Sequence, residues 1–479
     1  MLMNVRGDFM ATLQQQWFGN VRKDILAGMV AGLALIPESL AFAFILGVDP
    51  SVALYASFVI AVITAFVGGR TGLISAATGA MALVLVSLMA NHGLQYVLAA
   101  TVLTGVIQVV LGLLGVARLM RFIPNAVVLG FLNALGIMIF MTQLPYLVGV
   151  NTASYFFVGG TLLLVYLVPR FFTAIPATLI AIVVMTAIAV FTGASLQTVG
   201  DLGTMPQTLP MFLLPDIPLN LTTLKIILPY SLALAVVGLL ETLLTAQVLD
   251  EVTETPSDKN KEARGQGFAN VVTGFFGGMA GCALIGQSML NVQSGGRGRL
   301  STLTAGVFLM VLILLFGDSV IHIPMPVLAG IMVMVSFTTF NWGSFRFMRQ
   351  APKAEVVVML TTVAIILYTH NLAIGVVVGI LLSSLFFVAT ISRITVTQDG
   401  THYFVAGPLF FASTKTFSQA FDAVEAKMVT IDFSASHLYD ESAVAAIQKV
   451  QVQLQKKGTS VQLTGLNQPS AALLARLSH

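Results

Sequence analysis

Two glutamates lie inside long apolar stretches of the sequence: Glu38 in LALIPESLAFAF and Glu241 in VVGLLETLLTAQ. A charge in the middle of a membrane-spanning helix costs at least ~2.5–3.5 kcal/mol, so such residues line a cavity or have a partner. No lysine or arginine stands at the same depth, and burial without a cation disfavours the ionised carboxyl group. We therefore expect a proton or cation site, with at least one of the two carboxyl groups protonated at some stage. The alternative is a neutral glutamic acid that hydrogen-bonds two helices together.

Two other apolar stretches are interrupted by small and polar residues: Ser75–Met89 (SAATGAMALVLVSLM) and Cys282–Gly296 (CALIGQSMLNVQSGG). Each predicts a broken membrane span, in which an irregular segment precedes a short helix that begins near the middle of the bilayer. Irregular backbone at that depth survives only where protein or a water-filled cavity covers it. A helix N-terminus attracts anions through its charge of roughly +0.5 and its unpaired N–H groups. We expect the two helix starts to face each other and hold one small anion. The candidate ligands are Thr78, Gly79, Ala80, Gly286, Gln287 and Ser288.

Small residues also permit tight helix packing without any ligand, and this is the alternative for both stretches. Phe42, one helical turn after Glu38, is a candidate apolar wall of the anion site; otherwise it faces lipid or the protein core. The sequence shows no nucleophile–base arrangement, no phosphate-binding glycine loop and no nucleic-acid-binding surface. The histidines near the expected external helix ends, which have no metal-ligand spacing, are His92, His322 and His370. We therefore expect no enzyme, no cofactor, no metal and no nucleic-acid partner.

The composition places these residues in a membrane protein. The 479 residues are 57% hydrophobic and only 9% charged, with a mean hydropathy of +0.93, whereas a soluble globular protein has about 25% charged residues. The single cysteine excludes a disulfide framework within the chain. Residues 1–24 lack the apolar core and cleavage site of a signal peptide. We expect them to form a cytoplasmic interfacial segment, with Trp17 at the level of the lipid headgroups.

The apolar runs predict fourteen membrane spans between residues 25 and 393, since a spanning helix needs about 20 apolar residues and the broken spans are shorter. The first seven are Ile25–Leu46, Val52–Val67, Ser75–Met89, Tyr96–Val116, Pro124–Thr142, Tyr155–Val168 and Ile175–Phe191. The second seven are Ile226–Leu249, Gly267–Met279, Cys282–Gly296, Leu300–Phe316, Pro326–Phe340, Ala354–Tyr368 and Leu372–Ile391. Of the lysines and arginines up to Arg393, only Lys225 then falls outside, in agreement with the positive-inside rule. We expect a multi-pass membrane protein with both termini in the cytoplasm.

The two sets of spans, residues 25–193 and residues 226–392, repeat one pattern. Each first helix carries a lone glutamate roughly fifteen residues after a lysine, and a broken span follows the glutamate after about forty residues. An odd number of spans per set inverts the second set relative to the first. This arrangement is typical of inverted-repeat secondary transporters, whose binding site lies at the repeat interface near the midplane.

The chain from Ile394 to His479 has the composition of a soluble domain. We expect strands at ITVT, HYFVAG, LFFAS, VTIDFSAS and SVQLTG, and helices at Lys415–Lys427, Glu441–Lys456 and Pro469–Leu477. Strands that alternate with helices predict a small α/β domain on the cytoplasmic side.

Three motifs resemble those of the sulfate permease family, the bacterial relatives of solute carrier family 26. They are PESLAFAFILGVDPSVALYASF with GGRTGLISAATGAMALV, GLLETLLTAQVLDE with GQGFANVVTGFFGGMAGCALIGQSMLNVQSGGRGRLS, and VTIDFSASHLYDESAVAAI, which is similar to a STAS domain. The resemblance implies a polytopic α-helical fold of seven-plus-seven inverted repeats with core and gate domains, shared with uracil and anion-exchanger transporters, plus the small STAS domain. It also implies a homodimer that moves anions by an elevator-like shift of the core domain.

By resemblance, the family's anion site falls on the six candidate ligands named above. The residues that the first and eighth spans add to it are Glu38, Phe42, Glu241 and Thr245. Many animal members have arginine where this sequence has Gln287, and its absence favours co-transport with a proton over channel behaviour. Bicarbonate members that use sodium have aspartate at the position of Glu241, which weakens a sodium interpretation. In the STAS domain, Glu441 stands where regulatory antagonists have a phosphorylatable serine, so we expect that phosphoswitch to be missing.

The main prediction is a secondary active anion transporter that carries its substrate together with protons. Protonation of Glu38 or Glu241 removes repulsion of the anion, so that proton binding and anion binding are linked. Candidate substrates are dicarboxylates such as fumarate, sulfate and bicarbonate. The alternatives are an uncoupled anion channel, a sodium-coupled bicarbonate transporter, a membrane-tethered signalling protein that acts through its STAS domain, and a nucleobase permease on the same fold.

Overall fold

The structure, a computed structural model, describes residues 14–171, 175–201, 203, 205, 208–218 and 220–477. The first part of the predicted interfacial segment, residues 1–13, lies outside the described residues. Trp17 is described, and its ring contacts that of Phe66 with 5.0 Å between the centroids. The chain divides into two compact units, residues Met1–Gly379 and residues Ile380–His479.

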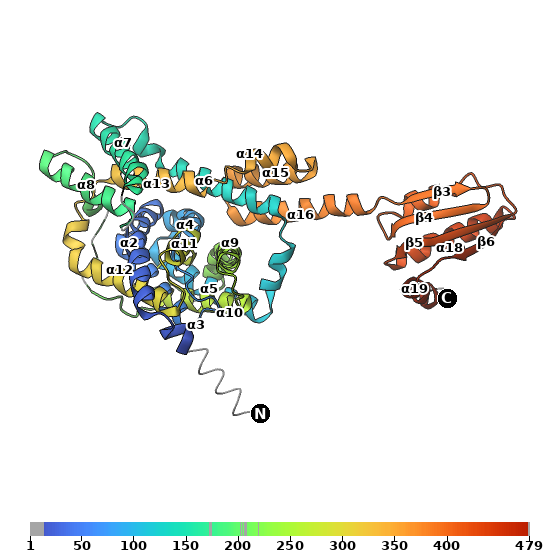
Figure 1. The fold of residues 1–479 in the computed structure, drawn as a ribbon, viewed down its shortest axis with the longest axis horizontal. Coiled ribbons are helices and arrows are strands. Elements are labelled where there is room, and N and C mark those ends of the chain that lie inside the picture. Colours follow the sequence, from blue (N-terminus) through green and yellow to red (C-terminus); the bar gives the residue numbers. More distant parts are fainter. Residues whose placement is uncertain are drawn as a thin grey trace, which may run out of the picture. The chain divides into compact units, whose positions relative to one another are not determined.

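The first unit consists almost entirely of helices (Figure 1). Its α-helices are α2 (Val21–Leu46), α3 (Pro50–Val67), α4 (Gly79–His92), α5 (Leu94–Leu113), α6 (Asn125–Leu147), α7 (Thr152–Leu167), α8 (Ala177–Thr192), α9 (Leu221–Thr253), α10 (Lys259–Phe275), α11 (Ile285–Gln293), α12 (Arg299–Val320), α13 (Met325–Thr339), α14 (Ser344–Gln350), α15 (Lys353–Thr369) and α16 (Leu372–Ile391), which continues into the second unit. The short 3-10 helices are η1 (Val116–Phe122), η2 (Val168–Arg170) and η3 (Val199–Asp201).

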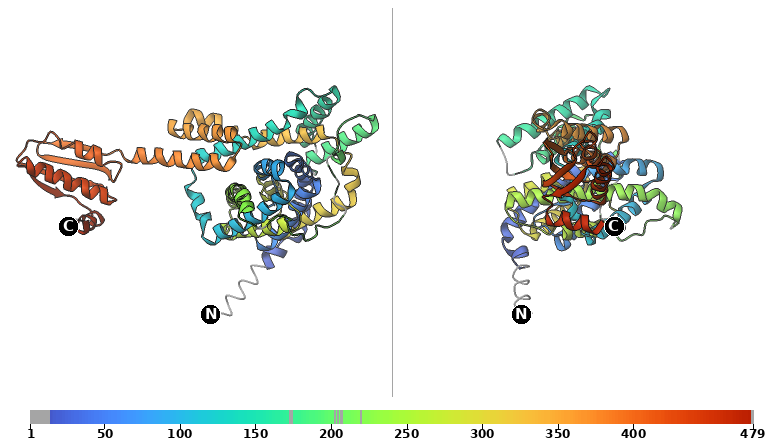
Figure 2. Two further views of the ribbon diagram at one scale, coloured as in Figure 1. Left: turned by 180° about the vertical axis from the view of Figure 1, so that it is seen from behind. Right: turned by 90° about the vertical axis from the view of Figure 1, so that its right-hand side faces the viewer.

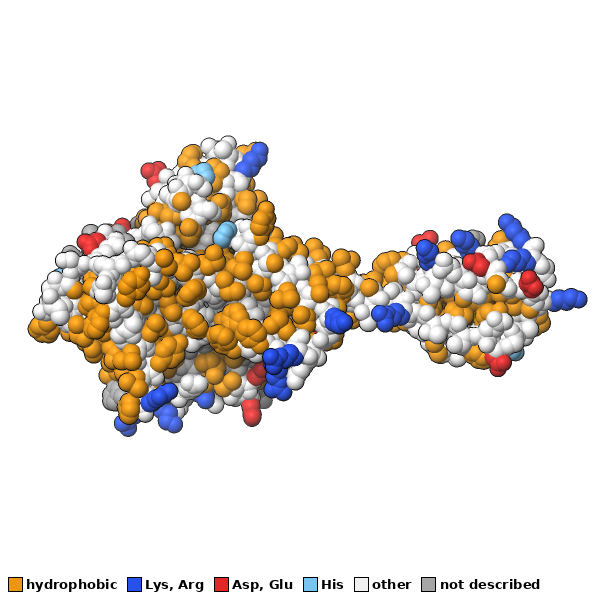
Figure 3. Space-filling view, turned by 90° about the horizontal axis from the view of Figure 1, so that it is seen from above, with side chains coloured by type: hydrophobic (Ala, Val, Ile, Leu, Met, Phe, Trp, Pro, Cys, Tyr) orange, Lys and Arg blue, Asp and Glu red, His pale blue; other side chains and the backbone are white. Residues whose placement is uncertain are grey.

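The outer surface of the first unit suits a membrane. Hydrophobic side chains cover most of its face in Figure 3, and the charged side chains gather mainly at the edges. Within the described part of the chain, nine helical segments are long and apolar enough to cross a bilayer, and α4 and α8 are shorter apolar helices. Each of the fourteen predicted spans overlaps a helix, but the number of crossings, their orientation and the inverted repeat stay predictions.

Several helices extend beyond the apolar runs from which they were predicted, because their ends are polar. The predicted span Gly267–Met279 corresponds to α10, which begins at Lys259 because the Asp258 side chain accepts a hydrogen bond from the Lys261 N–H at 2.9 Å and caps the helix. In the same way Asn220 caps α9 upstream of the predicted start. The short helix α14 was not predicted at all.

In each predicted broken span a short helix, α4 or α11, follows a segment that is a paired strand rather than irregular chain. β1 (Ser75–Ala77) and β2 (Gly281–Ala283) are antiparallel, with Ala76 opposite Cys282. Small side chains permit this contact, since a Cβ on Gly281 would collide with the carbonyl oxygen of Ala76. The pairing satisfies backbone groups that lipid could not satisfy.

Buried amide side chains take the place of a third strand along β2. The Asn270 side chain donates to the Gly281 carbonyl and accepts from the Gly281 N–H, each at 3.0 Å. Gln266 donates to the same carbonyl at 2.9 Å, and Gln108 accepts from Asn270 at 2.8 Å. On the β1 side, the Ser57 hydroxyl accepts from the Ala77 N–H at 3.2 Å. The ladder is therefore fixed from both edges.

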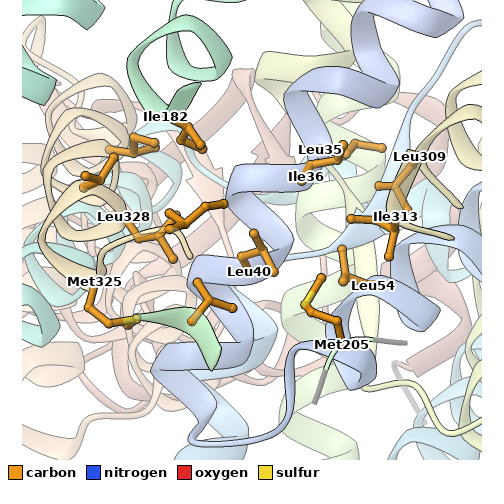
Figure 4. Packing of buried hydrophobic residues seen from close by; sticks show 14 of the residues in the cluster. Leu35, Ile36, Leu40, Leu54, Ile182, Met205, Leu309, Ile313, Met325 and Leu328 are labelled. Atoms are coloured by element: carbon orange, nitrogen blue, oxygen red, sulfur yellow. The ribbon is translucent and has the colours of Figure 1, made fainter. Parts of the chain in front are cut away.

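The helices of the first unit form two groups that pack chiefly within themselves (Figures 1 and 2). One group contains α2, α3, α4, α5, α9, α10, α11 and α12, and the other contains α6, α7, α8, α13 and α15. A hydrophobic cluster joins them, with Leu40 of α2 and Leu309 of α12 on one side and Ile182 of α8 and Leu328 of α13 on the other (Figure 4).

The second unit is a four-stranded sheet with three helices. Its elements are β3 (Thr395–Asp399), β4 (His402–Leu409), α17 (Thr414–Gln419), β5 (Met428–Leu438), α18 (Glu441–Lys456), β6 (Ser460–Thr464) and α19 (Gln468–Leu477). The strand order follows the chain, with β3 antiparallel to β4 and the other neighbours parallel. Its own hydrophobic core contains Phe417, Phe433, Ile447 and Leu454, so the predicted α/β domain is confirmed.

Two local predictions in this unit were wrong. The segment LFFAS is not a separate strand, because Leu409 ends β4 and the Ser413 hydroxyl then accepts from the Phe410 N–H at 3.0 Å and closes a turn. The predicted helix Lys415–Lys427 is limited to α17, and the turns after Gln419 still bury Phe421 in the core. The apolar spacing there serves the core without a continuous helix.

Candidate functional site

The start of α4 presents unpaired amide groups. Thr78 caps the helix, and its hydroxyl accepts from the Met81 N–H at 3.4 Å. No acceptor is found for the N–H groups of Gly79 and Ala80 among the described residues. A Cβ on Gly79 would stand 2.9 Å from a ring carbon of Phe42, so the ring lies directly against this helix start.

The start of α11 is open in the same way. Leu284 precedes it and provides no side-chain cap, and the described part of the chain offers no acceptor to the N–H groups of Ile285 and Gly286. Apart from its chain neighbours and the backbone of α11, no atom of the described residues lies within 4 Å of the position that a Cβ on Gly286 would take. Because β1 and β2 are antiparallel, α4 and α11 leave the ladder in opposite directions. α2 and α9 pack against both helices.

A cavity of about 600 Å³ lies where these elements meet the second group of helices. Its lining includes eight residues predicted for substrate or proton binding, together with the neighbouring residues Leu284 and Ile285. From the first group of helices they are Glu38, Phe42, Thr78, Gly79, Ala80, Glu241, Leu284, Ile285, Gly286 and Gln287. The structure therefore brings both helix starts and both glutamates, from four elements distant in sequence, to one cavity.

Each glutamate of the cavity bonds to a residue of the second broken span. The Gln287 amide donates to the carboxyl group of Glu38, and the Cys282 thiol donates to the carboxyl group of Glu241 at 2.7 Å. No ion pair with either carboxyl group is found among the described residues. Among the described residues of the lining, these two are also the only ones with an ionisable side chain.

Two predicted residues lie behind the cavity wall. The fully buried Ser288 hydroxyl accepts from the Ile74 N–H at 2.9 Å and so holds the chain before β1 against α11. The Thr245 hydroxyl donates to the carbonyl of Glu241 at 2.7 Å within α9. Neither residue lines the cavity; their contacts position the elements that do.

The opposite wall comes from residues that the sequence analysis missed. The residues that α6 and the α13–α14 region contribute are Leu132, Leu135, Ile139, Met334, Val335, Thr338, Thr339, Phe340, Asn341 and Trp342. The turn between α13 and α14 is held by the Asn133 side chain, which accepts from the Asn341 N–H at 2.9 Å. The aromatic residues around Trp342 were the one feature of the sequence that could have indicated this wall. Such a cluster is equally typical of an anchor at the membrane interface.

The arrangement suits the binding of a small anion without a fixed cation. Helix N-termini and uncapped N–H groups supply the attraction, and apolar side chains such as Phe42 and Ile139 exclude water. The described residues contain no group of three or more His, Cys, Asp or Glu side chains that could hold a metal ion.

Comparison with known proteins agrees with this organisation. The sequence profile of the sulfate permease family matches residues 21–159 and 154–362, and the STAS domain profile matches residues 392–479. The chain is 52% identical over 473 residues to the putative sulfate transporter YbaR of Bacillus subtilis, covering 98% of this chain and 99% of the relative. It is 28% identical over 419 residues to the bicarbonate transporter BicA of Picosynechococcus, covering 80% of this chain and 72% of the relative.

Two solved structures share the fold. The transmembrane domain of a cyanobacterial bicarbonate transporter BicA superimposes with a TM-score of 0.65 at 27% identity, covering 76% of this chain and 98% of that one. The murine solute carrier 26 family member A9 anion transporter gives a TM-score of 0.83 at 19% identity, covering 95% of this chain and 87% of that one. The chain belongs to the sulfate permease family of multi-pass membrane anion transporters and carries a STAS domain at residues 392–479.

Proposed function

We propose that this chain carries a small oxyanion across the bacterial inner membrane together with protons. One observation carries the proposal: the cavity that receives two open helix starts contains two carboxyl groups, Glu38 and Glu241, and no cationic side chain among its described residues. A site built only to attract anions would not place two acidic groups there. Acidic groups beside an anion are compatible with binding only when they are protonated.

The proposed ligands are the N–H groups at the two helix starts, the Thr78 hydroxyl and the Gln287 amide, with Phe42 as an apolar wall. These donors suit sulfate, bicarbonate and dicarboxylates such as fumarate alike. The names of the relatives, putative sulfate transporter and bicarbonate transporter, favour the first two.

The coupling free energy between proton binding and anion binding follows from the electrostatic repulsion between the carboxyl group and the anion. An ionised carboxyl group about 6 Å from a monovalent anion opposes its binding by about 3 kcal/mol at an effective dielectric constant of about 20. Protonation of Glu38 or Glu241 removes that term, and by reciprocity a bound anion favours protonation by the same amount. The proton and the anion then bind and leave together, which is the condition for symport.

The position of the cavity between two helix groups favours transport by movement of one group against the other. The group with α4 and α11 carries both helix starts, and α6 with α13 supplies the opposite wall. We propose an elevator-like shift of the first group along the second, in a homodimer with both termini in the cytoplasm. The joining cluster around Leu40 and Leu328 is apolar, so a shift there breaks no polar contacts within it.

Uptake into proteoliposomes tests the proposal. Purified protein takes up labelled sulfate, bicarbonate or fumarate, and an alkaline interior at clamped membrane potential is expected to increase the initial rate. Glu38→Gln and Glu241→Gln are expected to reduce this stimulation, whereas Glu355→Gln, on the exposed first turn of α15, keeps it. Stimulation by a sodium gradient instead, salt-gradient currents far above the stoichiometric flux, or unchanged coupling in both variants would each reject proton symport.

A further inference from the structure

The carboxyl group of Glu241 and the capping hydroxyl of α4 are joined through one sulfur atom. The Cys282 thiol donates to Glu241 Oε2 at 2.7 Å, and its Sγ lies 3.2 Å from Thr78 Oγ1. Thr78 Oγ1 in turn accepts from the Met81 N–H. Cys282 is fully buried and does not line the cavity, whereas Thr78 does. A buried thiol thus connects a carboxyl group of the cavity to the helix start that faces the anion.

The direction of this chain of hydrogen bonds is fixed by the protonation of Glu241. A hydroxyl and a thiol each have one proton to donate. When Glu241 is ionised, the thiol must donate to it, so the Thr78 hydroxyl donates to the sulfur. When Glu241 is protonated, its own O–H can donate to the sulfur and the thiol can donate to Thr78 Oγ1, so that the Thr78 O–H is available to another acceptor.

We infer that Cys282 is a positioning residue that couples the proton site to the anion site, an inference that rests on the proposed function. With Glu241 protonated, the Thr78 hydroxyl turns into the cavity and donates to the anion; with Glu241 ionised, the sulfur holds that donor away. This switch acts in addition to charge repulsion. No bond other than the O–H bond of Glu241 forms or breaks, and its proton comes from water.

Few other titratable groups face Glu241. Cys282 of β2, which packs against α9, contacts the Glu241 carboxyl group. Glu38 of α2 lines the same cavity. α11 carries no titratable side chain. The remaining charged or titratable residues of the packed elements whose side chains are described are His92, Tyr96, Arg118, Lys259, Lys261, Glu262 and Arg264. None of these lines the cavity, and each stands in or near the first or last turn of its helix, or in η1.

Anion affinity at an acidic and at an alkaline pH tests the switch. A hydrogen bond to a charged acceptor corresponds to about tenfold in affinity or more. Cys282→Ala frees the Thr78 hydroxyl at both pH values, so affinity is expected to rise about tenfold at alkaline pH only. Thr78→Val removes the donor, so affinity falls about tenfold at acidic pH only. Both variants therefore reduce the ratio of the anion affinity at acidic pH to that at alkaline pH, Cys282→Ala by raising the alkaline value and Thr78→Val by lowering the acidic value. Structural damage would instead lower the affinity at both pH values.

Conservative variants and a double variant complete the test. Cys282→Ser and Thr78→Ser each keep a side-chain hydrogen-bond donor and are expected to keep the wild-type ratio of anion affinities at acidic and alkaline pH. Cys282→Ala combined with Thr78→Val is expected to narrow the ratio no further than either alone. Thr101→Val, which removes a buried hydroxyl that donates to the Val97 carbonyl within α5, serves as the control for loss of a threonine hydroxyl. An unchanged ratio in Cys282→Ala, or equal losses at both pH values, overturns the inference.

The thiol also offers a readout independent of affinity, because Cys282 is the only cysteine in the chain. The single S–H stretching band in infrared difference spectra is expected to shift between acidic and alkaline pH, and to stay fixed in Glu241→Gln. A fixed band in the wild type overturns the switch even if uptake is proton-coupled. A wild-type affinity independent of pH instead rejects the proposed function itself.

Discussion

Gln287→Arg places a fixed positive charge where the cavity has none. The Gln287 amide donates to the carboxyl group of Glu38, and its side chain is 6% exposed at the cavity wall. The cavity of about 600 Å³ that Gln287 lines leaves room for the longer side chain. We expect the guanidinium to pair with Glu38 and hold it ionised, since arginine keeps its charge in proteins and matches carboxylate geometry.

The size of the effect follows from the net charge that the anion meets. In the wild type an ionised Glu38 about 6 Å away costs a monovalent anion about 3 kcal/mol at an effective dielectric constant of about 20. The Arg–Glu pair is neutral, so this cost disappears at alkaline pH, which corresponds to about a hundredfold gain in affinity. At acidic pH the wild-type carboxyl group is already neutral, and the two proteins are expected to bind alike.

Calorimetric titration of sulfate or bicarbonate at several pH values measures this difference. Gln287→Met, similar in length but without charge or hydrogen-bonding amide, is the matched control for loss of the amide and is expected to show no tightening at alkaline pH. Equal tightening at every pH would mean that Glu38 does not titrate in the relevant range. No tightening at alkaline pH would mean that the anion does not bind beside Gln287, and the reasoning fails.

Three further variants test the packing around the site and the second unit. Gly79→Ala places a methyl group 2.9 Å from the Phe42 ring and is expected to lower the free energy of unfolding in detergent by about 1–3 kcal/mol. Gly286→Ala, at a position with open space around it, is the control and is expected to leave the stability unchanged. Asn270→Ala leaves two buried groups in the β2 network without partners and is expected to lower the unfolding temperature, at about 1–3 kcal/mol per group. Asp440→Ala removes the cap of α18 and is expected to cost about 1–2 kcal/mol, measured as faster hydrogen exchange in α18; Asp440→Asn retains it.

The positions of the two broken spans could be predicted because small and polar residues interrupt otherwise uniform apolar runs. Thr78 followed by a glycine marks a helix start by ordinary capping chemistry, and the structure begins α4 there. The glutamates could be predicted because a carboxyl group in an apolar run needs an explanation. Their placement at one site together with Gln287 came from the resemblance to the sulfate permease family.

The pairing of β1 with β2 could not be predicted, because three-residue segments such as SAA and GCA have no periodicity that distinguishes strand from loop. The wall from Thr338 to Trp342 was missed for a different reason. Its residues are ordinary membrane-helix residues, and only the fold shows that they face the two helix starts. The role of Cys282 was likewise invisible, since its partners lie 41 and 204 positions away.

The ladder of three residue pairs explains why neither half of the first unit could form this site alone. β1 and α4 belong to the first half, and β2 and α11 belong to the second. Glu38 of the first half bonds Gln287 of the second, and Cys282 of the second half contacts Thr78 of the first. Each helix start therefore has its polar neighbour from the opposite half. Any motion that separates the strands would take apart the proposed anion site together with these contacts. The proposed shift must therefore carry β1, β2, α4 and α11 as one body. The contacts of α2 with α8 and α13, rather than the ladder, are then the surface that slides.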